Sequence, residues 1–247
     1  MSRKAREKSS TGIYHIMISG LNRQNIFDDD EDYERFLQIV KDVKEICGFK
    51  LYSYCLMGNH CHLLLKTEQA GLEQIIKRIG IKYVYWYNTK NKRTGHLFQD
   101  RFKSEAVESD EYLLSVLKYI HQKPKQAKLC KKISEYKWSS YKEYTGKKKI
   151  IDTDYIYDLT DKKEFGKFHK TKTSEMIMDL QEKNFKLSDS EAKEIILKKI
   201  KRTDPADFKL FDRTDQIKYI REFREARISM RQINRLTGVS KGIIGKA

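Results

Sequence analysis

Residues 56–65 read Leu-Met-Gly-Asn-His-Cys-His-Leu-Leu-Leu, an apolar run in which two histidines, His60 and His62, stand one residue apart. Side chains at positions i and i+2 of a β-strand point to the same face of a sheet. A strand at this position would place both imidazoles on one face and turn Cys61 toward the other. Two imidazoles so spaced can share one divalent ion, although a single strand histidine is more often a packed core residue. The spacing by itself leaves both interpretations open.

The composition favours a folded protein with a polyanionic partner. Of the 247 residues, 39% are hydrophobic and 11% aromatic, so the chain can bury a core. The formal net charge is +16, and the commonest polyanion that such an excess attracts is nucleic acid. A basic surface that serves only solubility is the alternative.

The cysteines and the apolar segments indicate the compartment. The four cysteines include no CxxC pair, which argues against a zinc ribbon or a disulfide framework and favours a reducing compartment. No segment approaches the roughly 20 apolar residues of a membrane span, and the basic N-terminus has no apolar run behind it. The sequence therefore predicts a cytoplasmic, nucleoid-associated protein with no membrane partner.

Strand and helix patterns alternate over the first half of the chain. Alternating or continuous apolar runs predict strands, and apolar residues three to four positions apart predict helices. The expected strands are residues 12–20, 49–58, 60–66 and part of 95–107, and the expected helices are 28–48, which stops at Gly48, 71–91 and 109–123, which ends before Pro124. This order predicts an α+β fold of the ferredoxin-like type, an antiparallel sheet with the helices on one face.

The rest of the chain divides at a stretch without clear periodicity. Residues 147–186 are interpreted as an extension and linker, which places a first domain at 1–146 and a small all-α domain at 187–247. Near the end, a helix, a turn at Gly238 and a further helix form a helix-turn-helix pattern, for which a plain helical cap is the alternative. Its basic side chains favour DNA binding, namely Arg231, Arg235 and Lys241.

Four stretches occur in a characteristic order along residues 11–146. They are GIYHIMISGLNRQNIFDDDEDYERF at 12–36, LMGNHCHLLL at 56–65, GHLFQDRFKSE at 95–105 and YLLSVLKYIHQKP at 112–124. Together they resemble the single-tyrosine HUH transposases of the IS200-like type, and more narrowly the REP-associated tyrosine transposases. HUH denotes histidine, bulky hydrophobe, histidine, and here Cys61 occupies the middle position.

The resemblance implies a metal-dependent cleavage of single-stranded DNA. In that family the two strand histidines, here His60 and His62, hold Mg²⁺ or Mn²⁺, which polarises the scissile phosphate. A helix tyrosine attacks the phosphorus and forms a 5′-phosphotyrosine link, leaving a free 3′-hydroxyl. The implied substrate is repeat or hairpin DNA, and the implied state is a monomer or a homodimer.

Tyr119 is the expected nucleophile. The family pattern Tyr-Ile-x-x-Asn-Pro is matched by residues 119–124, which read Tyr-Ile-His-Gln-Lys-Pro. On a helix, Tyr119 falls at the margin of the apolar stripe, where its side chain can reach out of the core. Tyr112, seven residues earlier, is the alternative nucleophile.

One position departs from the family pattern. The family has a polar amide where this chain has Lys123, and an ammonium group cannot ligate a cation. Lys123 could contact a DNA phosphate or stabilise a phenolate, while Gln122 or Glu105 could supply the third metal ligand. Two other functions stay open: a DNA-binding regulator that has lost cleavage, which Lys123 favours, and a replication-initiator nickase of the same chemistry.

Four further residues are expected to contact DNA. The resemblance implies this role for Asn22 and Arg23, which follow the first strand, and for Arg101 and Lys103, which lie around the start of the fourth. His15, in the first strand, is interpreted as a structural residue or as a support for the histidine pair.

Overall fold

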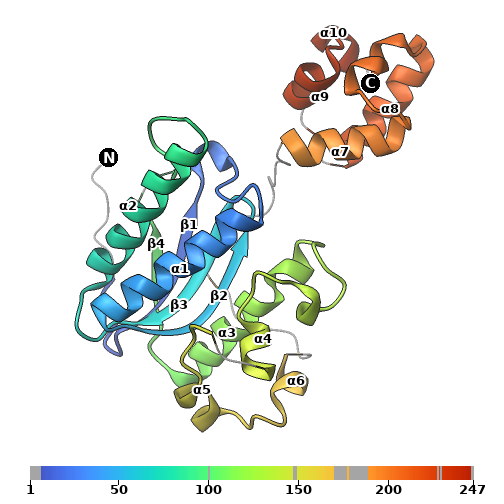
Figure 1. The fold of residues 1–247 in the computed structure, drawn as a ribbon. Coiled ribbons are helices and arrows are strands. Elements are labelled where there is room, and N and C mark those ends of the chain that lie inside the picture. The colour runs from blue at the N-terminus through green and yellow to red at the C-terminus, as the bar shows by residue number, and fades with distance from the viewer. Residues whose placement is uncertain are drawn as a thin grey trace. The chain divides into compact units, whose positions relative to one another are not determined.

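The computed structural model contains two compact units, Met1–Asp179 and Leu180–Ala247. In Figure 1 the first unit runs from blue to yellow and the second from orange to red. The residues described are 7–99, 101–146, 149–169, 177, 189–226, 228 and 230–245, with side chains for all of these except 189–191, 231 and 241.

The first unit is built on a four-stranded antiparallel sheet with the strand order β2-β3-β1-β4. The strands are β1 (Ile13–Ser19), β2 (Lys50–Met57), β3 (His60–Lys66) and β4 (Lys103–Ala106). Helix α1 (Asp30–Cys47) connects β1 to β2, and helix α2 (Leu72–Lys90) connects β3 to β4. This βαββαβ order, with β1 and β3 in the centre, is the predicted ferredoxin-like arrangement.

Helices cover both faces of this sheet. On one face α1 and α2 lie next to each other (Figure 1), and Tyr83 of α2 is close enough to Cys61 of β3 to interact electrostatically. The next strand residue, His62, lies against Tyr119 of α3 (Asp110–Gln126), with ring centroids 5.9 Å apart. Because successive strand side chains point to opposite faces, α3 covers the face opposite α1 and α2. The prediction that the helices share one face is therefore wrong, because strands buried on both faces need cover on both.

Local sequence sets both ends of α1. The Asp29 carboxylate accepts a hydrogen bond from Asp32 N at 3.1 Å, and the Asp32 carboxylate accepts one from Asp29 N at 3.3 Å, which forms a capping box. Gly48, with φ 63°, ends the helix in the left-handed conformation, as predicted. Lys90, at the end of α2, binds both carboxylates at 2.7 and 2.8 Å. These ion pairs tie the start of α1 to the end of α2.

α3 continues past Pro124, so its predicted end before this residue is wrong. A proline removes one backbone N–H and therefore one helical hydrogen bond. The missing hydrogen bond lies near the end of the helix, and one turn further on Ala127 N still donates to Lys123 O at 2.9 Å. Leu129 N then donates to the carbonyl of Pro124 at 2.9 Å. The last turn is therefore closed by other bonds despite the proline.

The chain after α3 covers the outer edge of β2. Leu56 N donates to Trp138 O at 2.9 Å, and Ser140 N donates to Tyr54 O at 3.0 Å. The elements of this region are a 3-10 turn (Ile133–Glu135), α4 (Tyr141–Thr145), α5 (Asp154–Leu159) and α6 (Phe165–Phe168). Residues 149–169 of the predicted extension therefore pack within the first unit.

The second unit is helical in its described residues. Its elements are α7 (Asp189–Ile200), the 3-10 helix η4 (Pro205–Leu210), α8 (Arg213–Glu225), α9 (Met230–Thr237) and α10 (Lys241–Ile244). They enclose an apolar core that includes Ile196, Phe208, Phe223 and Ile233. Gly238, with φ 68°, turns the chain between α9 and α10. The helix-turn-helix stays a prediction, because α10 spans only about one turn.

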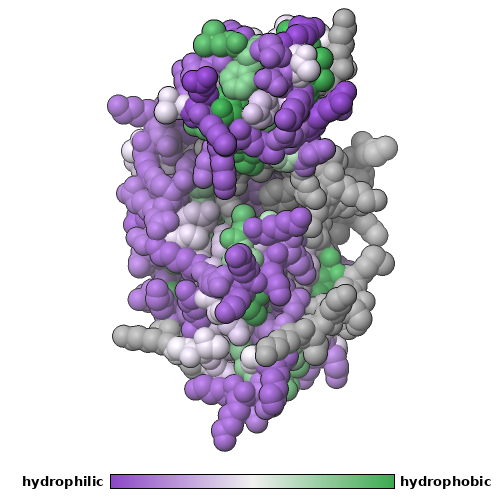
Figure 2. Space-filling model, turned by 90° about the vertical axis from the view of Figure 1, so that its right-hand side faces the viewer, coloured by the Kyte–Doolittle hydropathy of each residue, from purple (hydrophilic) through white to green (hydrophobic). Residues whose placement is uncertain are grey.

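The surface of the described residues is largely polar. On the face shown in Figure 2, hydrophilic residues predominate and hydrophobic ones gather only in small groups. This agrees with a chain in which 35% of the residues are charged. Among the helices described, none is both long and apolar enough to cross a membrane.

We expect Phe36→Ala to destabilise the first unit by about 3–5 kcal/mol, the usual cost of emptying a buried phenylalanine site. Phe36 is fully buried in α1 and packs edge-on against Phe27 and Tyr83, with ring centroids 5.3 and 5.1 Å apart. Urea unfolding followed by tryptophan fluorescence reports on this unit alone, because both tryptophans, Trp86 and Trp138, lie in it.

The matched control for this prediction is Ile46→Ala in the same helix. Ile46 is 56% exposed, so the free energy of unfolding should change by no more than about 0.5 kcal/mol. Equal losses for the two variants would contradict the core position assigned to Phe36.

Candidate active site

His60 and His62 lie side by side on one face of the sheet. Both belong to β3 and are buried, with exposed fractions of 1% and 0%. Their ring centroids are 5.1 Å apart, while Cys61 between them faces α2. The structure therefore has the arrangement that the strand spacing predicts.

A hydrogen-bonded chain fixes the orientation of His62. Nδ1 of His15 is 3.3 Å from the Glu105 carboxylate, and Nε2 of His15 is 2.9 Å from Nδ1 of His62. A carboxylate accepts hydrogen bonds, so a neutral His15 donates from Nδ1 and accepts through Nε2. His62 then donates from Nδ1 and keeps a lone pair on Nε2. That buried atom has no hydrogen-bond partner among the residues described.

His60 is oriented in the same way by its neighbour in the chain. Its Nδ1 is 2.7 Å from the amide oxygen Oδ1 of Asn59. An amide oxygen only accepts, so His60 donates from Nδ1 and carries its lone pair on Nε2. Both histidines therefore present the same nitrogen to a ligand, and the partners of Nδ1 act as orienting groups.

Tyr119 lies against this pair from the opposite layer. Its ring, on α3, makes edge contacts with His62 and His15, with centroids 5.9 and 6.0 Å apart. It is only 8% exposed, and so more enclosed than its position at the margin of the apolar stripe predicts. Tyr112, the alternative nucleophile, lies in the first turn of the same helix, about two turns earlier. The fold therefore places Tyr119 in contact with the face of the sheet that carries His60 and His62.

Lys123 is buried beside the same tyrosine. Its exposed fraction is 0%, and its Nζ is 5.2 Å from the centroid of the Tyr119 ring. Burial lowers the pKa of His62 well below its usual value, and the charges of His60, His15 and Lys123 lower that pKa further. His62 is therefore neutral, and a lysine lies near it.

The predicted third metal ligands are placed elsewhere. Glu105 is bound to His15. Gln122 donates from Nε2 to the carbonyl of His169 at 2.7 Å, which ties it to the segment after α6. Within the described ranges, no group of three or more His, Cys, Asp or Glu side chains is arranged to hold a metal ion.

The residues present therefore do not complete a metal centre. The Nε2 atoms of His60 and His62 suit a divalent ion, but Lys123, whose charge acts on His62, has no lone pair with which to ligate one. A positive charge beside the pair repels a cation bound there and attracts an anion. Lys123 thus opposes a cation at the site and favours an anion.

A second buried histidine network joins α3 to the segment at residues 165–169. Nδ1 of His169 donates to the Phe165 carbonyl at 2.8 Å, and Nε2 of His169 is 2.8 Å from Nδ1 of His121 on α3. Nε2 of His121 is 2.8 Å from Oγ of Ser140. Burial favours the neutral form of both imidazoles, in which His121 donates from Nδ1 to Nε2 of His169 and accepts through Nε2 from the Ser140 hydroxyl. Sequence analysis missed the network, since two isolated histidines form no pattern.

Asn22 and Arg23 lie at the end of the sheet that carries His60. Ser19, the last residue of β1, is paired with His60, the first residue of β3. The turn after Ser19 carries Asn22, which is exposed, and Arg23, which is partly exposed. Both have positive φ, 51° and 62°, so this turn is sharply bent. Because Ser19 is paired with His60, the turn that carries Asn22 and Arg23 lies close to the histidine pair along the sheet.

Arg101 and Lys103 are exposed at the same end. Lys103, the first residue of β4, is paired with Met17 of β1, and Met17 is paired with His62 of β3. Paired residues share a face, so Lys103 lies on the face that carries the histidines. The four predicted DNA contacts of the first unit are thus gathered around one end of the sheet.

The basic residues predicted for the second unit are less fully described. Arg235 lies on α9 and is exposed. Arg231 and Lys241 belong to α9 and α10, but their side chains lie outside the described part of the structure. Their contribution to DNA binding stays a prediction.

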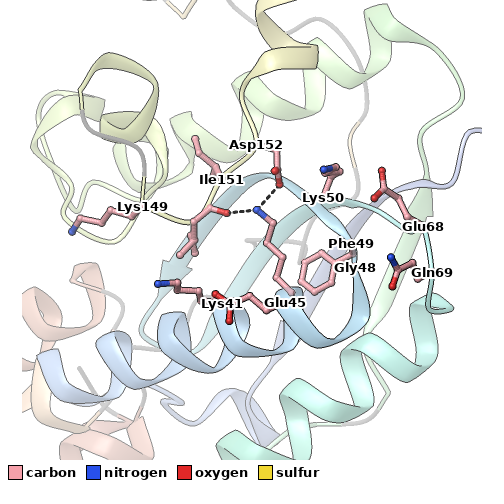
Figure 3. A pocket seen from close by; sticks show the side chains of 12 residues that line it. Lys41, Glu45, Gly48, Phe49, Lys50, Glu68, Gln69, Lys149, Ile151 and Asp152 are labelled. Carbon is pink, nitrogen blue, oxygen red and sulfur yellow. Dashed lines mark hydrogen bonds and ion pairs between the residues drawn. The ribbon is translucent and has the colours of Figure 1, made fainter.

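A groove beside the end of α1 is separate from these residues (Figure 3). It lies near Lys50, at the opposite end of β2 from the residue paired with His60. Across it, Lys44 Nζ donates to the Ile150 carbonyl at 2.8 Å and binds the Asp152 carboxylate at 2.6 Å. The groove mixes acidic with basic side chains and holds none of the predicted site residues.

Residues 8–123 match the family model described as "Transposase IS200 like". This range contains the whole sheet, the histidine pair, Tyr119 and Lys123. The resemblance to the IS200-like transposases is confirmed. The IS200-like segment therefore includes every residue of the candidate active site, whereas the segment at 165–169 and the second unit lie beyond it.

Solved structures that are similar to the chain include two transposases. The REP-associated tyrosine transposase bound to a REP hairpin is 16% identical, with a TM-score of 0.53, and the match covers 72% of this chain and 100% of that one. A candidate transposase from Deinococcus radiodurans R1 is 20% identical, with a TM-score of 0.35, covering 49% of this chain and 97% of that one. At these identities the first comparison shows a shared fold. No curated protein matches the sequence significantly.

The second histidine network makes the stability of the first unit depend on pH. Burial lowers the pKa of His169 to about 4, and burial also lowers the pKa of His121 well below its usual value. In the unfolded chain both histidines have a pKa of about 6.5, so they bind a proton more readily there than in the folded chain. Stability should therefore be complete above about pH 6.5 and fall toward pH 4, by roughly 3 kcal/mol from His169 alone.

Urea unfolding by tryptophan fluorescence between pH 4 and pH 7 measures this dependence. The double variant His121→Leu/His169→Leu should show a flatter profile, since neither position then takes up a proton. An unchanged slope in the double variant would show that other groups cause the loss of stability.

Proposed function

We propose that the protein is a transposase-like endonuclease and strand transferase of single-stranded DNA, with Tyr119 as its nucleophile. The observation that most supports this is the contact of the Tyr119 ring with His62 and His15, which joins two motifs from distant parts of the chain. The match of residues 8–123 to the IS200-like transposases supports the class of reaction.

In the proposed reaction, Oη of Tyr119 attacks the phosphorus of a phosphodiester in single-stranded DNA. The new bond joins Oη to phosphorus, and the bond from phosphorus to the 3′ oxygen breaks. The phenol loses one proton, and the leaving 3′ oxygen takes one up. The products are a 5′-phosphotyrosine and a free 3′-hydroxyl. Attack on the phosphotyrosine by another 3′-hydroxyl would join strands without ATP.

Hairpin or repeat DNA is the proposed substrate. A relative of similar fold was solved bound to a REP hairpin. Exposed residues around the end of the sheet that carries His60 would contact the DNA backbone, and a net charge of +16 favours such binding. The proposed contacts are Asn22, Arg23, Arg101 and Lys103 in the first unit, with Arg231, Arg235 and Lys241 in the second.

Mg²⁺ or Mn²⁺ bound through Nε2 of His60 and His62 stays a prediction. The hydrogen bonds of their Nδ1 atoms leave the correct nitrogen for a metal. Two protein ligands would hold such an ion weakly, because a complete site for a divalent cation uses more.

A DNA-binding regulator that no longer cleaves is the second candidate. The observation that favours it is the buried Lys123, which lies beside Tyr119 and opposes a metal ion at the histidine pair. Binding of a hairpin without any covalent product would distinguish this function from the first.

A covalent protein–DNA adduct is the expected product when the protein is incubated with single-stranded hairpin oligonucleotides and Mn²⁺. Tyr119→Phe should abolish the adduct on a denaturing gel, because it removes the attacking oxygen while keeping the ring. Tyr112→Phe is the matched control and should form the adduct as the wild type does. Loss of the adduct in Tyr112→Phe but not in Tyr119→Phe would show that Tyr112 is the nucleophile. Tight hairpin binding with no adduct from any variant would support the regulator.

His60→Ala and His62→Ala should each reduce adduct formation by about 10²-fold or more, the usual cost of losing a group that acts at the reacting centre. Hairpin binding in a gel-shift assay should persist, since both histidines are buried. His96→Ala, at an exposed histidine outside the site, is the control and should change neither readout. If His60→Ala and His62→Ala both cleave as the wild type does, the two histidines take no part in cleavage.

A further inference from the structure

We propose that the ammonium group of Lys123 binds the scissile phosphate and neutralises its charge, so that cleavage by Tyr119 needs no divalent metal ion. The inference rests on the proposed function and goes beyond it, because it names the group that supplies positive charge at the reacting phosphate.

The position of Lys123 relative to the nucleophile is the first argument. Lys123 follows Tyr119 by one turn of α3, and its Nζ lies 5.2 Å from the centroid of the Tyr119 ring. Its charge also acts on Cys55 and on His62, which are paired with each other across β2 and β3. The ammonium group therefore lies between α3 and the sheet, on the face that carries the histidines.

The burial of Lys123 is the second argument. Lysine is almost never fully buried in proteins unless it is paired, and Lys123 is among the largest completely enclosed side chains of the described residues. A cation removed from water attracts an anion more strongly than a cation on the surface does. The backbone phosphate of a bound DNA strand is such an anion, and Tyr119 is where the proposed reaction needs it.

The chemistry of an ammonium group is the third argument. It has three N–H donors and no lone pair, so it can donate to a phosphate oxygen but cannot ligate a metal. When Oη bonds to phosphorus and the bond to the 3′ oxygen lengthens, negative charge builds up on the non-bridging oxygens. A donor held in place before the reaction stabilises that charge without reorganising. Lys123 would thus serve as the cation of the site.

The test is adduct formation by the full-length chain on a hairpin oligonucleotide, with EDTA or with Mn²⁺. The wild type should form the adduct at similar rates in both. Lys123→Gln should lose about 10²-fold in EDTA, the usual cost of one such donor, and recover on addition of Mn²⁺, because its amide oxygen can ligate the ion. Lys125→Gln, at an exposed position of the same helix, should behave as the wild type.

A second readout does not depend on cleavage. Binding of Mn²⁺ to the DNA-free protein, followed by the electron paramagnetic resonance signal of the free ion, should be weak for the wild type. Lys123→Gln should bind Mn²⁺ about tenfold more tightly, because a repelling charge is replaced by a ligand. Equal affinities would overturn the proposal, because Lys123 would then not oppose a metal at this site.

The outcomes separate this inference from the function on which it rests. A wild-type adduct that forms only with Mn²⁺ overturns the role of Lys123 and leaves the proposed function standing. No adduct under any condition overturns both. If tryptophan fluorescence shows that Lys123→Gln does not fold, Lys123→Arg takes its place. That variant keeps the charge and should keep the adduct in EDTA, and a need for Mn²⁺ in it would overturn the proposal.

Discussion

The register of β1 between β3 and β4 is the constraint on which the candidate active site depends. It places His15 directly opposite Glu105 and within 2.9 Å of His62, measured from Nε2 to Nδ1. Through these two contacts the carboxylate decides which nitrogen of His62 carries the proton. A slip of β1 by one residue would turn His15 to the other face and separate it from both Glu105 and His62.

The position of α3 is the second requirement, and residues without any motif provide part of it. His121 and Gln122 of α3 are both hydrogen bonded to His169, which lies beyond the IS200-like segment. These bonds hold the helix that carries Tyr119 and Lys123 against the sheet. The segment at residues 165–169 therefore affects the geometry of the candidate site although it contributes no reacting group.

The charge balance around Tyr119 decides which ligand the site accepts. Buried, neutral imidazoles can bind either a metal ion or a polar group, because their lone pairs on Nε2 are available to both kinds of partner. The ammonium group of Lys123 removes this ambiguity, since it repels a cation and attracts a phosphate. The same residue explains why the metal centre is incomplete, and under the proposed function it would attract the backbone phosphate of a DNA strand.

Much of this protein could be predicted from sequence, because the deciding patterns are local. Strand alternation placed His60 and His62 on one face, and helical spacing placed Tyr119 and Lys123 one turn apart. Sequence could not decide which face α3 covers, whether Lys123 is buried, or that Glu105 pairs with His15 instead of joining the histidine pair. Those outcomes depend on the register of non-neighbouring strands and on side chains brought together from distant segments. Only the tertiary structure determines them, because burial and charge act through space and not along the chain.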